Sequence, residues 1–328
     1  MILAGDIGGT NARLALFAIE ARRPRLVTEQ TYPSRGHSSL YEIVDLFRAD
    51  HRESVDQSCF GIPGPIHVGR SVATNLPWVV DSRELARRLG IAEVGLINDL
   101  EANAWGIHEL GAGDFEVLQT GAPDAVGNSA VIAAGTGLGQ AGLFWNGKAH
   151  LPFASEGGHA SFSPADDLQI ELLRHLQSKF GVVSWERVVS GPGLVNIYTF
   201  LRDTGRGVEP EWLRLAIAAS DPPPIIYDAA IGHKSPLCEM ALDLFCSLYG
   251  SEAGNLAVKM MATGGIYLGG GIAPKILPLL RQSAFLKSFL NKGRVRPVLE
   301  QMPVQVILNR STALIGAARR AGAGVGLC

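Results

Sequence analysis

The feature that most constrains this chain is the stretch LAGDIGGTNARLALF at residues 3–17. A short apolar strand runs into Asp6, a tight turn follows at Gly8, Gly9 and Thr10, and an alternating strand begins at Asn11. Glycines let the backbone turn sharply and present N–H groups to an anion, and the two polar side chains add donors. The pattern predicts the phosphate-binding hairpin of a kinase or ATPase. An ordinary glycine-containing hairpin is the alternative.

Two further glycine-rich turns support a nucleotide ligand. Residues 130–145, AVIAAGTGLGQAGLFW, repeat the strand–turn–strand plan around Gly135, Thr136 and Gly137, which suggests two similar halves that face one ligand. The third turn contains Gly269, Gly270 and Gly271. It follows an apolar strand at 266–268 and precedes Pro274, which suits the first turn of a helix. A strand-to-helix turn of this kind can hold a nucleotide at the helix N-terminus.

Length and composition predict a globular protein of two domains. A chain of 328 residues is long for a single core, and strand-like runs alternate with helical patterns, as in α/β proteins. The predicted helices lie at 38–49, 82–89, 100–110 and 312–321, and the predicted strands include 58–62, 94–97 and 303–308. The last helix is expected to pack back on the first part of the chain. The predicted domains are therefore 1–110 plus 309–328, and 111–308.

The same composition argues against several partners. The formal net charge of −2 comes with no basic stripe, so nucleic acid is not the expected partner. No apolar run is long enough to cross a bilayer, and the first strand leaves no room for a signal peptide. The four cysteines are widely spaced and form no Cys-x-x-Cys, which fits reduced thiols in a cytosol. We expect a cytoplasmic protein without a membrane partner.

Asp99 is the candidate catalytic base. It follows the apolar run at 94–97, where a parallel strand would release the chain at the carboxyl edge of a sheet. Phosphoryl transfer to a hydroxyl requires a group that accepts its proton. Asn98 can both donate to and accept from a sugar hydroxyl. The alternative is that Asp99 is only the N-cap of the helix that begins near residue 100, and both roles can coexist.

A second polar cluster surrounds Glu156 and His159. The glycines between them would let a carboxylate and an imidazole turn toward one small ligand, although a solvated loop is the alternative. A zinc site is the poorer interpretation, because no second His or Cys lies at ligand spacing. Glu186 lies in the sequence VSWER, and its position alone favours a helix-dipole contact in a first turn that Ser184 caps.

Seven segments together resemble the bacterial glucokinase family over nearly the whole chain. They are DIGGTNARLALF at 6–17, ATNLPW at 73–78, LINDLEANAWGI at 96–107, AAGTGLGQAGLF at 133–144, SEGGHASF at 155–162, ERVVSGPGLVNIY at 186–198 and YLGGGIAP at 267–274. The resemblance implies an actin-like, ribonuclease H-like two-domain α/β fold with the active site in an interdomain cleft. It also implies ATP-dependent phosphorylation of glucose at its 6-hydroxyl, the first step of glycolysis, by a cytoplasmic homodimer.

The family's functional residues transfer to matching positions in this sequence. Asp99 matches the general base. The residues that match sugar contacts are Asn75, Asn98, Glu156, His159 and Glu186, so the resemblance moves Glu186 from a helix-dipole contact to a site residue. The ATP set is Asp6, Gly8, Gly9, Thr10 and Asn11 in the first phosphate loop, Gly135, Thr136 and Gly137 in the second, and Gly269, Gly270 and Gly271 at the adenosine.

The resemblance implies Mg²⁺ as a cofactor, held through the ATP phosphates. A water held by Asp6 is its expected link to the protein, and no dedicated metal cage is expected. Three alternatives remain at this stage. The ROK sugar kinases and repressors share the fold, but a cysteine-rich zinc motif after the sugar-binding His and an N-terminal helix-turn-helix are both missing here. Actin-like or chaperone ATPases would lack the sugar set, and a silent sugar sensor would bind glucose without releasing ADP.

Overall fold

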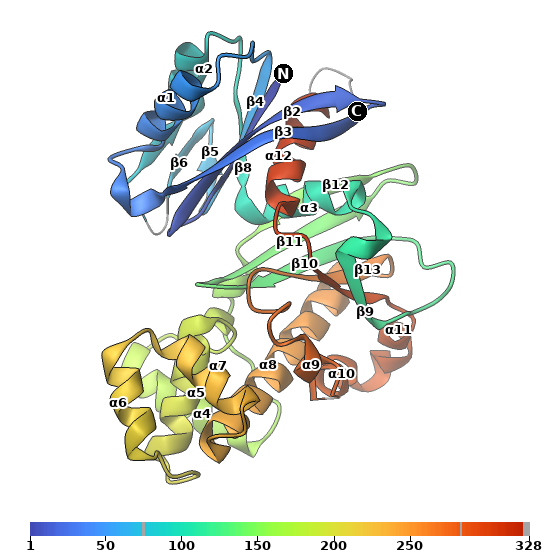
Figure 1. Cartoon of the computed structure of the whole chain (residues 1–328). Coiled ribbons are helices and arrows are strands. Elements are labelled where there is room, and N and C mark those ends of the chain that lie inside the picture. The colour runs from blue at the N-terminus through green and yellow to red at the C-terminus, as the bar shows by residue number, and fades with distance from the viewer. Residues whose placement is uncertain (74–75, 283, 324–328) are drawn as a thin grey trace. The chain divides into compact units, whose positions relative to one another are not determined.

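The computed structural model describes residues 1–73, 76–282 and 284–323 (Figure 1). Asn75, a predicted sugar contact, lies outside the described residues. Contacts divide the chain into two compact units, one comprising Met1–Phe115, Ala141–Ala154 and the chain from Asn309, the other Glu116–Gln140 and Ser155–Leu308. The predicted division places 141–154 with 111–308 instead, and it stays a prediction. None of the helices in the described ranges has the length and hydropathy of a membrane span.

The first unit contains a five-stranded sheet in the order β3-β2-β1-β4-β8. Its strands are β1 (Ile2–Ile7), β2 (Asn11–Glu20), β3 (Arg23–Pro33), β4 (Gln57–Ile62) and β8 (Gly95–Asn98). β1 and β2 form the predicted antiparallel hairpin, and β1, β4 and β8 run parallel. Asp6 is opposite Gly61, which is opposite Ile97. The carboxyl ends of three parallel strands therefore place Asp6 and Asn98 at one edge of the sheet.

The two faces of this sheet bury two separate cores, because side chains alternate between faces along each strand. Leu3 and Ile7 of β1 join a core with α1 (Leu40–Asp50) and α2 (Ser82–Leu89). Ile2 and Ala4 join the other core with α3 (Asp99–Gly106) and α12 (Thr312–Ala323). Asp81 caps α2, and Gly90 ends it in the left-handed conformation at φ 68°.

Helices α3 and α12 cross with their backbones in contact. A Cβ added to Gly106 would lie 3.0 Å from the carbonyl carbon of Thr312, and one added to Gly316 would lie 2.6 Å from the nitrogen of Gly106. Alanines flank this crossing, among them Ala102 and Ala313. The prediction that the C-terminal helix packs on the first part of the chain is therefore confirmed, and α3, which begins with Asp99, is held along its length.

The remaining elements of the first unit are short. A three-stranded sheet consists of β5 (Ile66–His67), β6 (Arg70–Val72) and β7 (Val79–Asp81), and the single-turn 3-10 helices are η1 (Ser34–Gly36), η2 (Ile107–Glu109) and η3 (Ala112–Asp114). The sequence predicted one helix over 100–110. In the structure α3 ends at Gly106, and residues 107–109 form the 3-10 turn η2. Gly106 lies against the backbone of Thr312, and the chain tightens into the 3-10 turn directly after this contact.

The second sheet has the order β12-β11-β10-β13-β14-β9. Its strands are β9 (Phe115–Gln119), β10 (Ser129–Ala134), β11 (Leu138–Trp145), β12 (His150–Ser155), β13 (Gly265–Gly269) and β14 (Val304–Ile307). β10, β13 and β14 run parallel, with Ala133 opposite Gly269. The turns that follow β10 and β13 therefore begin side by side at one edge of the sheet.

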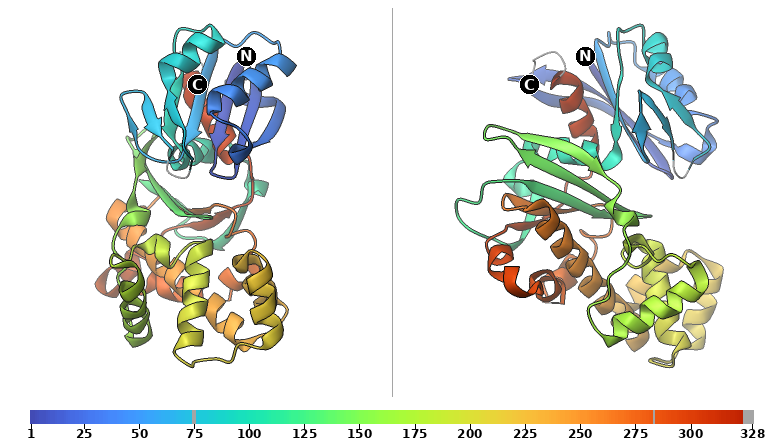
Figure 2. Two further views of the ribbon diagram at one scale, coloured as in Figure 1. Left: turned by 90° about the vertical axis from the view of Figure 1, so that its left-hand side faces the viewer. Right: turned by 180° about the vertical axis from the view of Figure 1, so that it is seen from behind.

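The 25-residue helix α8 (Pro236–Met260) is the buried centre of the second unit. The helices α4 (Asp167–Phe180), α5 (Gly191–Asp203), α6 (Glu211–Ala219) and α7 (Pro222–Ile231) lie together near its first half (Figure 1, Figure 2). Shorter helices cover its second half, namely α9 (Leu277–Leu280), α10 (Ala284–Leu290), η6 (Gly293–Val295) and α11 (Arg296–Glu300). Two 3-10 turns, η4 (Gly157–His159) and η5 (Trp185–Arg187), carry predicted site residues.

The predicted helix directly after the third glycine turn is wrong. Residues 270–276 form consecutive turns, and α9 begins only at Leu277, so Pro274 is not in the first turn of a helix. Gly270 has φ 80°, and the N–H of Ile272 donates to the carbonyl of Ala134 at 3.2 Å. These two features turn the chain back over the end of β10 before a helix can start.

Candidate active site

A buried serine, Ser34, holds the first glycine turn through two hydrogen bonds. Ser34 donates its hydroxyl to the carbonyl of Gly8 at 2.7 Å, and its N–H donates to the carbonyl of Thr10 at 2.9 Å. The N–H of Gly8 also donates to the carbonyl of Asn11 at 2.9 Å, which closes the turn. Neither Gly8 nor Gly9 has a positive φ. A Cβ added to Gly8 would lie 3.0 Å from the carbonyl oxygen of Asn11, so this position favours glycine for space rather than for a left-handed backbone. Thr10 and Asn11 are exposed, as a ligand-facing turn requires.

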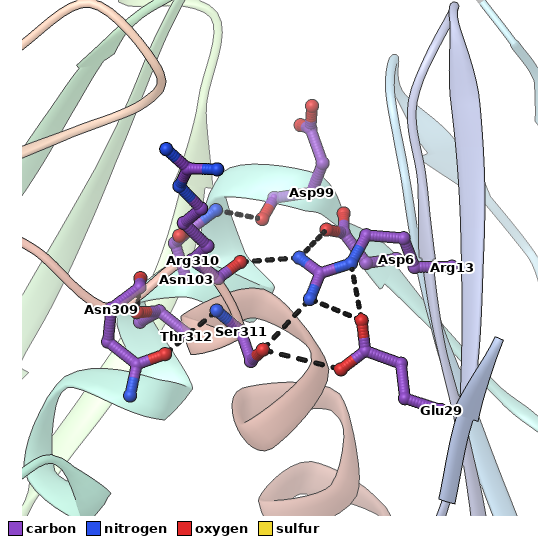
Figure 3. A network of polar contacts seen from close by, with 9 residues as sticks. All are labelled: Asp6, Arg13, Glu29, Asp99, Asn103, Asn309, Arg310, Ser311 and Thr312. Carbon is purple, nitrogen blue, oxygen red and sulfur yellow. Dashed lines mark hydrogen bonds and ion pairs between the residues drawn. The ribbon is translucent and has the colours of Figure 1, made fainter. Parts of the chain in front are cut away.

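Asp6 lies beside an arginine that ties three segments of the first unit together (Figure 3). Arg13 is 3.8 Å from the carboxylate of Asp6, and its Nε and Nη2 donate to Glu29 at 3.0 and 2.6 Å. The same guanidinium donates to the carbonyl of Arg310 and, at 2.8 Å, to the hydroxyl of Ser311. Burial raises the pKa of Asp6; Arg13 opposes this rise and Glu29 adds to it.

Asn98, not Asp99, is the N-cap of α3. The amide oxygen of Asn98 accepts hydrogen bonds from the N–H groups of Leu100 at 2.9 Å and Glu101 at 3.4 Å. The alternative that assigned the cap to Asp99 is therefore wrong. Asp99 is half-buried in the first turn, where its Oδ1 lies 2.9 Å from the N–H of Leu100. Its carboxylate points away from the Arg13 guanidinium, while its backbone carbonyl accepts a bond from Asn103 (Figure 3).

The second glycine turn is fixed by the start of α5 and by Glu186. Gly135 donates to the carbonyl of Gly137 at 2.9 Å, and its own carbonyl accepts from Gly191 at 2.8 Å. The N–H of Leu138 donates to Oε2 of Glu186 at 3.1 Å. Ser184 makes no capping hydrogen bond. The prediction of a Ser184-capped turn was therefore wrong, and the carboxylate of Glu186 lies instead at the end of the second glycine turn.

Glu156 and His159 share a scaffold with Glu186. The segment 160–162 pairs with 183–185 through a Ser161–Ser184 bridge, and Trp185 donates to the carbonyl of Ala160 at 3.0 Å. Glu156, His159 and Glu186 each lie within a few residues of this pairing. The side chains of Glu156 and His159 are 3.8 Å apart and 55% exposed, so both are open to a ligand.

Leu138 connects the segment that carries Glu156 and His159 to the second glycine turn. A Cβ added to Gly158 would lie 2.9 Å from the carbonyl carbon of Leu138, so the turn that carries Glu156 rests on the first residue of β11. The N–H of the same residue is held by Glu186. The structure thus brings together Glu156, His159, Glu186 and the second glycine turn within one unit.

The third glycine turn lies against the second. A Cβ added to Gly270 would lie 3.0 Å from the backbone nitrogen and carbonyl carbon of Ala134, directly before Gly135. Gly271 faces open space. A flat ligand can therefore approach the backbone here, which suits the predicted adenosine position. No group of three or more His, Cys, Asp or Glu that could hold a metal ion occurs among the described residues.

Comparison with known proteins identifies the family. The sequence model described as Glucokinase matches residues 3–323. The chain belongs to the glucokinase family. A glucokinase of Nostoc sp. is 43% identical over 334 residues, which cover 97% of this chain and 98% of the relative. Membership of this family makes the chain a hexose kinase.

Solved structures place the fold among the actin-like ATPases. The glucokinase from an Antarctic psychrotroph superposes with a TM-score of 0.84 at 31% identity, covering 98% of both chains. A ROK family glucokinase from Streptomyces griseus, solved in complex with glucose and AMPPNP, has a TM-score of 0.65 at 22% identity, with 98% of this chain and 99% of that chain covered. At that identity the likeness concerns the fold alone. The predicted fold class is confirmed.

Sequence reasoning missed the residues that support the site. Arg13 was interpreted only as part of an alternating strand, where a cation between apolar Ala12 and Leu14 faces the other side of the sheet and signals only some charged partner there. Ser34 and Gln140 gave no such signal. Their hydrogen-bond partners, Gly8 and Glu252, are 26 and 112 residues away along the chain, so only the fold shows which segments these two side chains support.

Proposed function

We propose that this chain transfers the γ-phosphate of ATP to the 6-hydroxyl of glucose, giving glucose 6-phosphate and ADP. The observation that carries the proposal is the bond between Glu186 and the N–H of Leu138. It places a predicted sugar-binding carboxylate directly on a predicted phosphate turn. An enzyme that brings a hydroxyl to a phosphate needs this adjacency, because reactants held in a near-attack geometry react far faster than free ones.

Asp99 is proposed as the general base. A sugar hydroxyl is a poor nucleophile, so a carboxylate that accepts its proton during attack on the γ-phosphate contributes about 10²- to 10⁴-fold in rate. Asn98 holds α3 in place through its oxygen, and its amide nitrogen donates to the carbonyl of Gly64 at 3.5 Å. One N–H of that amide remains for a sugar hydroxyl.

Selectivity for glucose is proposed to come from Glu156, His159 and Glu186. A hydrogen bond to a charged group contributes about 1.5–3 kcal/mol, so a hexose with a misplaced hydroxyl leaves a carboxylate without its partner. The exposure of Glu156 and His159 allows them to close on the sugar when it binds. We therefore expect glucose to be a better substrate than its epimers.

ATP is proposed to bind through the three glycine turns, with its phosphates on the first two. The first supplies Gly8, Gly9, Thr10 and Asn11, the second supplies Gly135, Thr136 and Gly137, and the third, at Gly269–Gly271, holds the adenosine. The half-buried carboxylate of Asp6 fits a hydrated Mg²⁺ beside the phosphates. That ion would offset charge on the leaving diphosphate. A cytoplasmic homodimer is part of the proposal on family grounds.

A sugar panel tests this proposal. Purified protein is incubated with MgATP and glucose, mannose, galactose or glucosamine, and both ADP and sugar phosphate are measured. We expect glucose-dependent ADP release with equimolar glucose 6-phosphate, and little ADP without sugar. Glucose binding without ADP release would contradict the proposal and indicate a sugar sensor. ADP release at the same rate with and without sugar would indicate a general ATPase.

A further inference from the structure

A fully buried carboxylate lies behind the turn that carries Glu156 and His159. Glu252 of α8 has no exposed surface, and neither proposed substrate set includes it. Its Oε1 accepts a hydrogen bond from Nε2 of Gln140 at 2.7 Å, and its Oε2 accepts one from Asn255 at 2.9 Å. A buried charge costs several kcal/mol of desolvation, and an apolar side chain would fill the same space at lower cost.

The other end of this network is a lysine from the loop after α10. The ammonium of Lys292 donates to Oδ1 of Asn255 at 2.8 Å and to the carbonyl of Ser251 at 2.9 Å. The charge of Glu252 is thus balanced through one intervening amide. Each side chain in the series from Lys292 through Asn255 and Glu252 to Gln140 is hydrogen-bonded to the next, which restricts the motion of all four.

Gln140 connects this hydrogen-bonded series to the turn 156–159. Its side chain is 3% exposed and lies in β11, two residues after Leu138. A Cβ added to Gly157 would lie 2.9 Å from Cδ of Gln140 and 3.1 Å from the hydroxyl of Ser155. The amide of Gln140 is therefore the surface on which the backbone between Glu156 and His159 rests.

We propose that Gln140 and Glu252 are positioning residues for the glucose-binding turn 156–159. Glu252 holds the side-chain amide of Gln140 in place through a hydrogen bond, and this amide sets the position of the turn backbone at Gly157. The inference rests on the proposed function, since the turn is a sugar site only if the chain binds glucose. Changes at Gln140 or Glu252 should therefore alter the affinity for glucose but not the affinity for ATP.

The test compares two variants with a matched control. Gln140→Met keeps the volume of the side chain but removes the amide that meets Glu252. Glu252→Gln keeps the shape but leaves one oxygen to accept from two donors. The control is Glu209→Gln, in the same unit, where a largely buried carboxylate accepts from Tyr198 at 2.7 Å and Arg202 at 3.2 Å, apart from the sugar segment. Its loss lowers stability without touching the turn.

Glucose affinity is measured by calorimetry in the absence of ATP, alongside the KM for each substrate and the Tm. For Gln140→Met we expect the Kd for glucose to rise about tenfold, which corresponds to about 1.4 kcal/mol, with the KM for ATP within about twofold of wild type. Glu252→Gln should show a smaller rise in the same direction. Glu209→Gln should lower the Tm and leave the Kd for glucose unchanged.

Three outcomes overturn the inference in distinguishable ways. If the wild-type protein phosphorylates glucose and both variants bind it with wild-type affinity, the positioning role is wrong and the proposed function stands. If Glu209→Gln weakens glucose binding as much as Gln140→Met, the effect is general destabilisation and the positioning role is again wrong. If the wild-type protein neither binds nor phosphorylates glucose, the proposed function fails and this inference fails with it.

Discussion

The backbone N–H of Leu138 donates a hydrogen bond to Oε2 of Glu186 at 3.1 Å. The carbonyl of the same leucine lies against Gly158, so one residue contacts both segments of the proposed sugar site and begins the strand after the phosphate turn. A change at Glu186 should therefore affect both substrates.

We expect Glu186→Ala to raise the KM for glucose and the KM for ATP together, because the variant removes a sugar partner and the acceptor of the Leu138 N–H. The loss of a hydrogen bond to a charged group, about 1.5–3 kcal/mol, corresponds to roughly 10- to 100-fold. Glu186→Gln keeps an acceptor oxygen, so the KM for ATP should stay near wild type. Steady-state kinetics with each substrate varied measures both effects. An unchanged KM for ATP in Glu186→Ala would refute this coupling.

The glycine at 158 should resist substitution. An alanine there would press against the backbone of Leu138, which cannot move without β11, and overpacking of this kind costs about 1–3 kcal/mol. Urea denaturation of Gly158→Ala measures the loss. Gly113→Ala is the control, because a Cβ there meets nothing within 4 Å. Equal stability of the two variants would show that the turn does not rest on β11.

Arg13 should stabilise the first unit through its hydrogen bonds. Arg13→Met removes the donors to Glu29, Arg310 and Ser311, and we expect a loss of roughly 1.5–3 kcal/mol in the free energy of unfolding. Arg13→Lys keeps the positive charge but not the planar guanidinium, so it should recover only part of the lost free energy of unfolding. Arg296→Met, which breaks an exposed pair with Glu300, should stay within about 0.5 kcal/mol of wild type. A wild-type denaturation midpoint for Arg13→Met would contradict this account.

The sequence predicted the glycine hairpins and the paired strands because these depend on neighbouring residues. The Gly8–Thr10 turn is an example in which local chemistry decided the structure. The family resemblance supplied the role of Glu186, which local spacing alone would have left as a helix-terminal acid. The position of Asp99 directly after an apolar strand already made it a candidate base, with the N-cap as the alternative.

The sequence could not predict contacts that join distant segments. Glu186 binds the N–H of Leu138 across 48 residues, and Arg13 binds Ser311 across 298. The start of α9 was misplaced for the same reason, since the bond from Ile272 to Ala134 that delays it comes from a strand more than a hundred residues earlier. Such bonds follow from topology, which no local pattern contains.

Stability should depend on the ionisation of Glu252. Burial raises the pKa of this carboxyl above its ordinary value of 4.5, against the opposing effects of Gln140, Asn255, Lys259 and Lys292. A raised folded-state pKa favours folding below the unfolded value, and this contribution is lost as the pH rises through the folded value. Glu252→Gln has no such loss, so its stability relative to wild type should increase with pH.

Urea denaturation of both proteins at about pH 4.5, 6 and 8 measures this difference. The Glu209→Gln variant, examined in parallel, serves as the control for a carboxylate with a different environment. A constant difference between Glu252→Gln and wild type across this range would mean that the carboxyl does not titrate there.

The most direct test of the proposed mechanism is the turnover of Asp99→Asn. The amide keeps an oxygen to accept from the N–H of Leu100, so the start of α3 should be preserved. We expect glucose affinity within a few-fold of wild type and a fall in kcat of about 10²- to 10⁴-fold, because the proton acceptor is lost. Glu101→Gln, two residues further along the same turn, should retain turnover. An Asp99→Asn variant that phosphorylates glucose at the wild-type rate would contradict the assignment of the base.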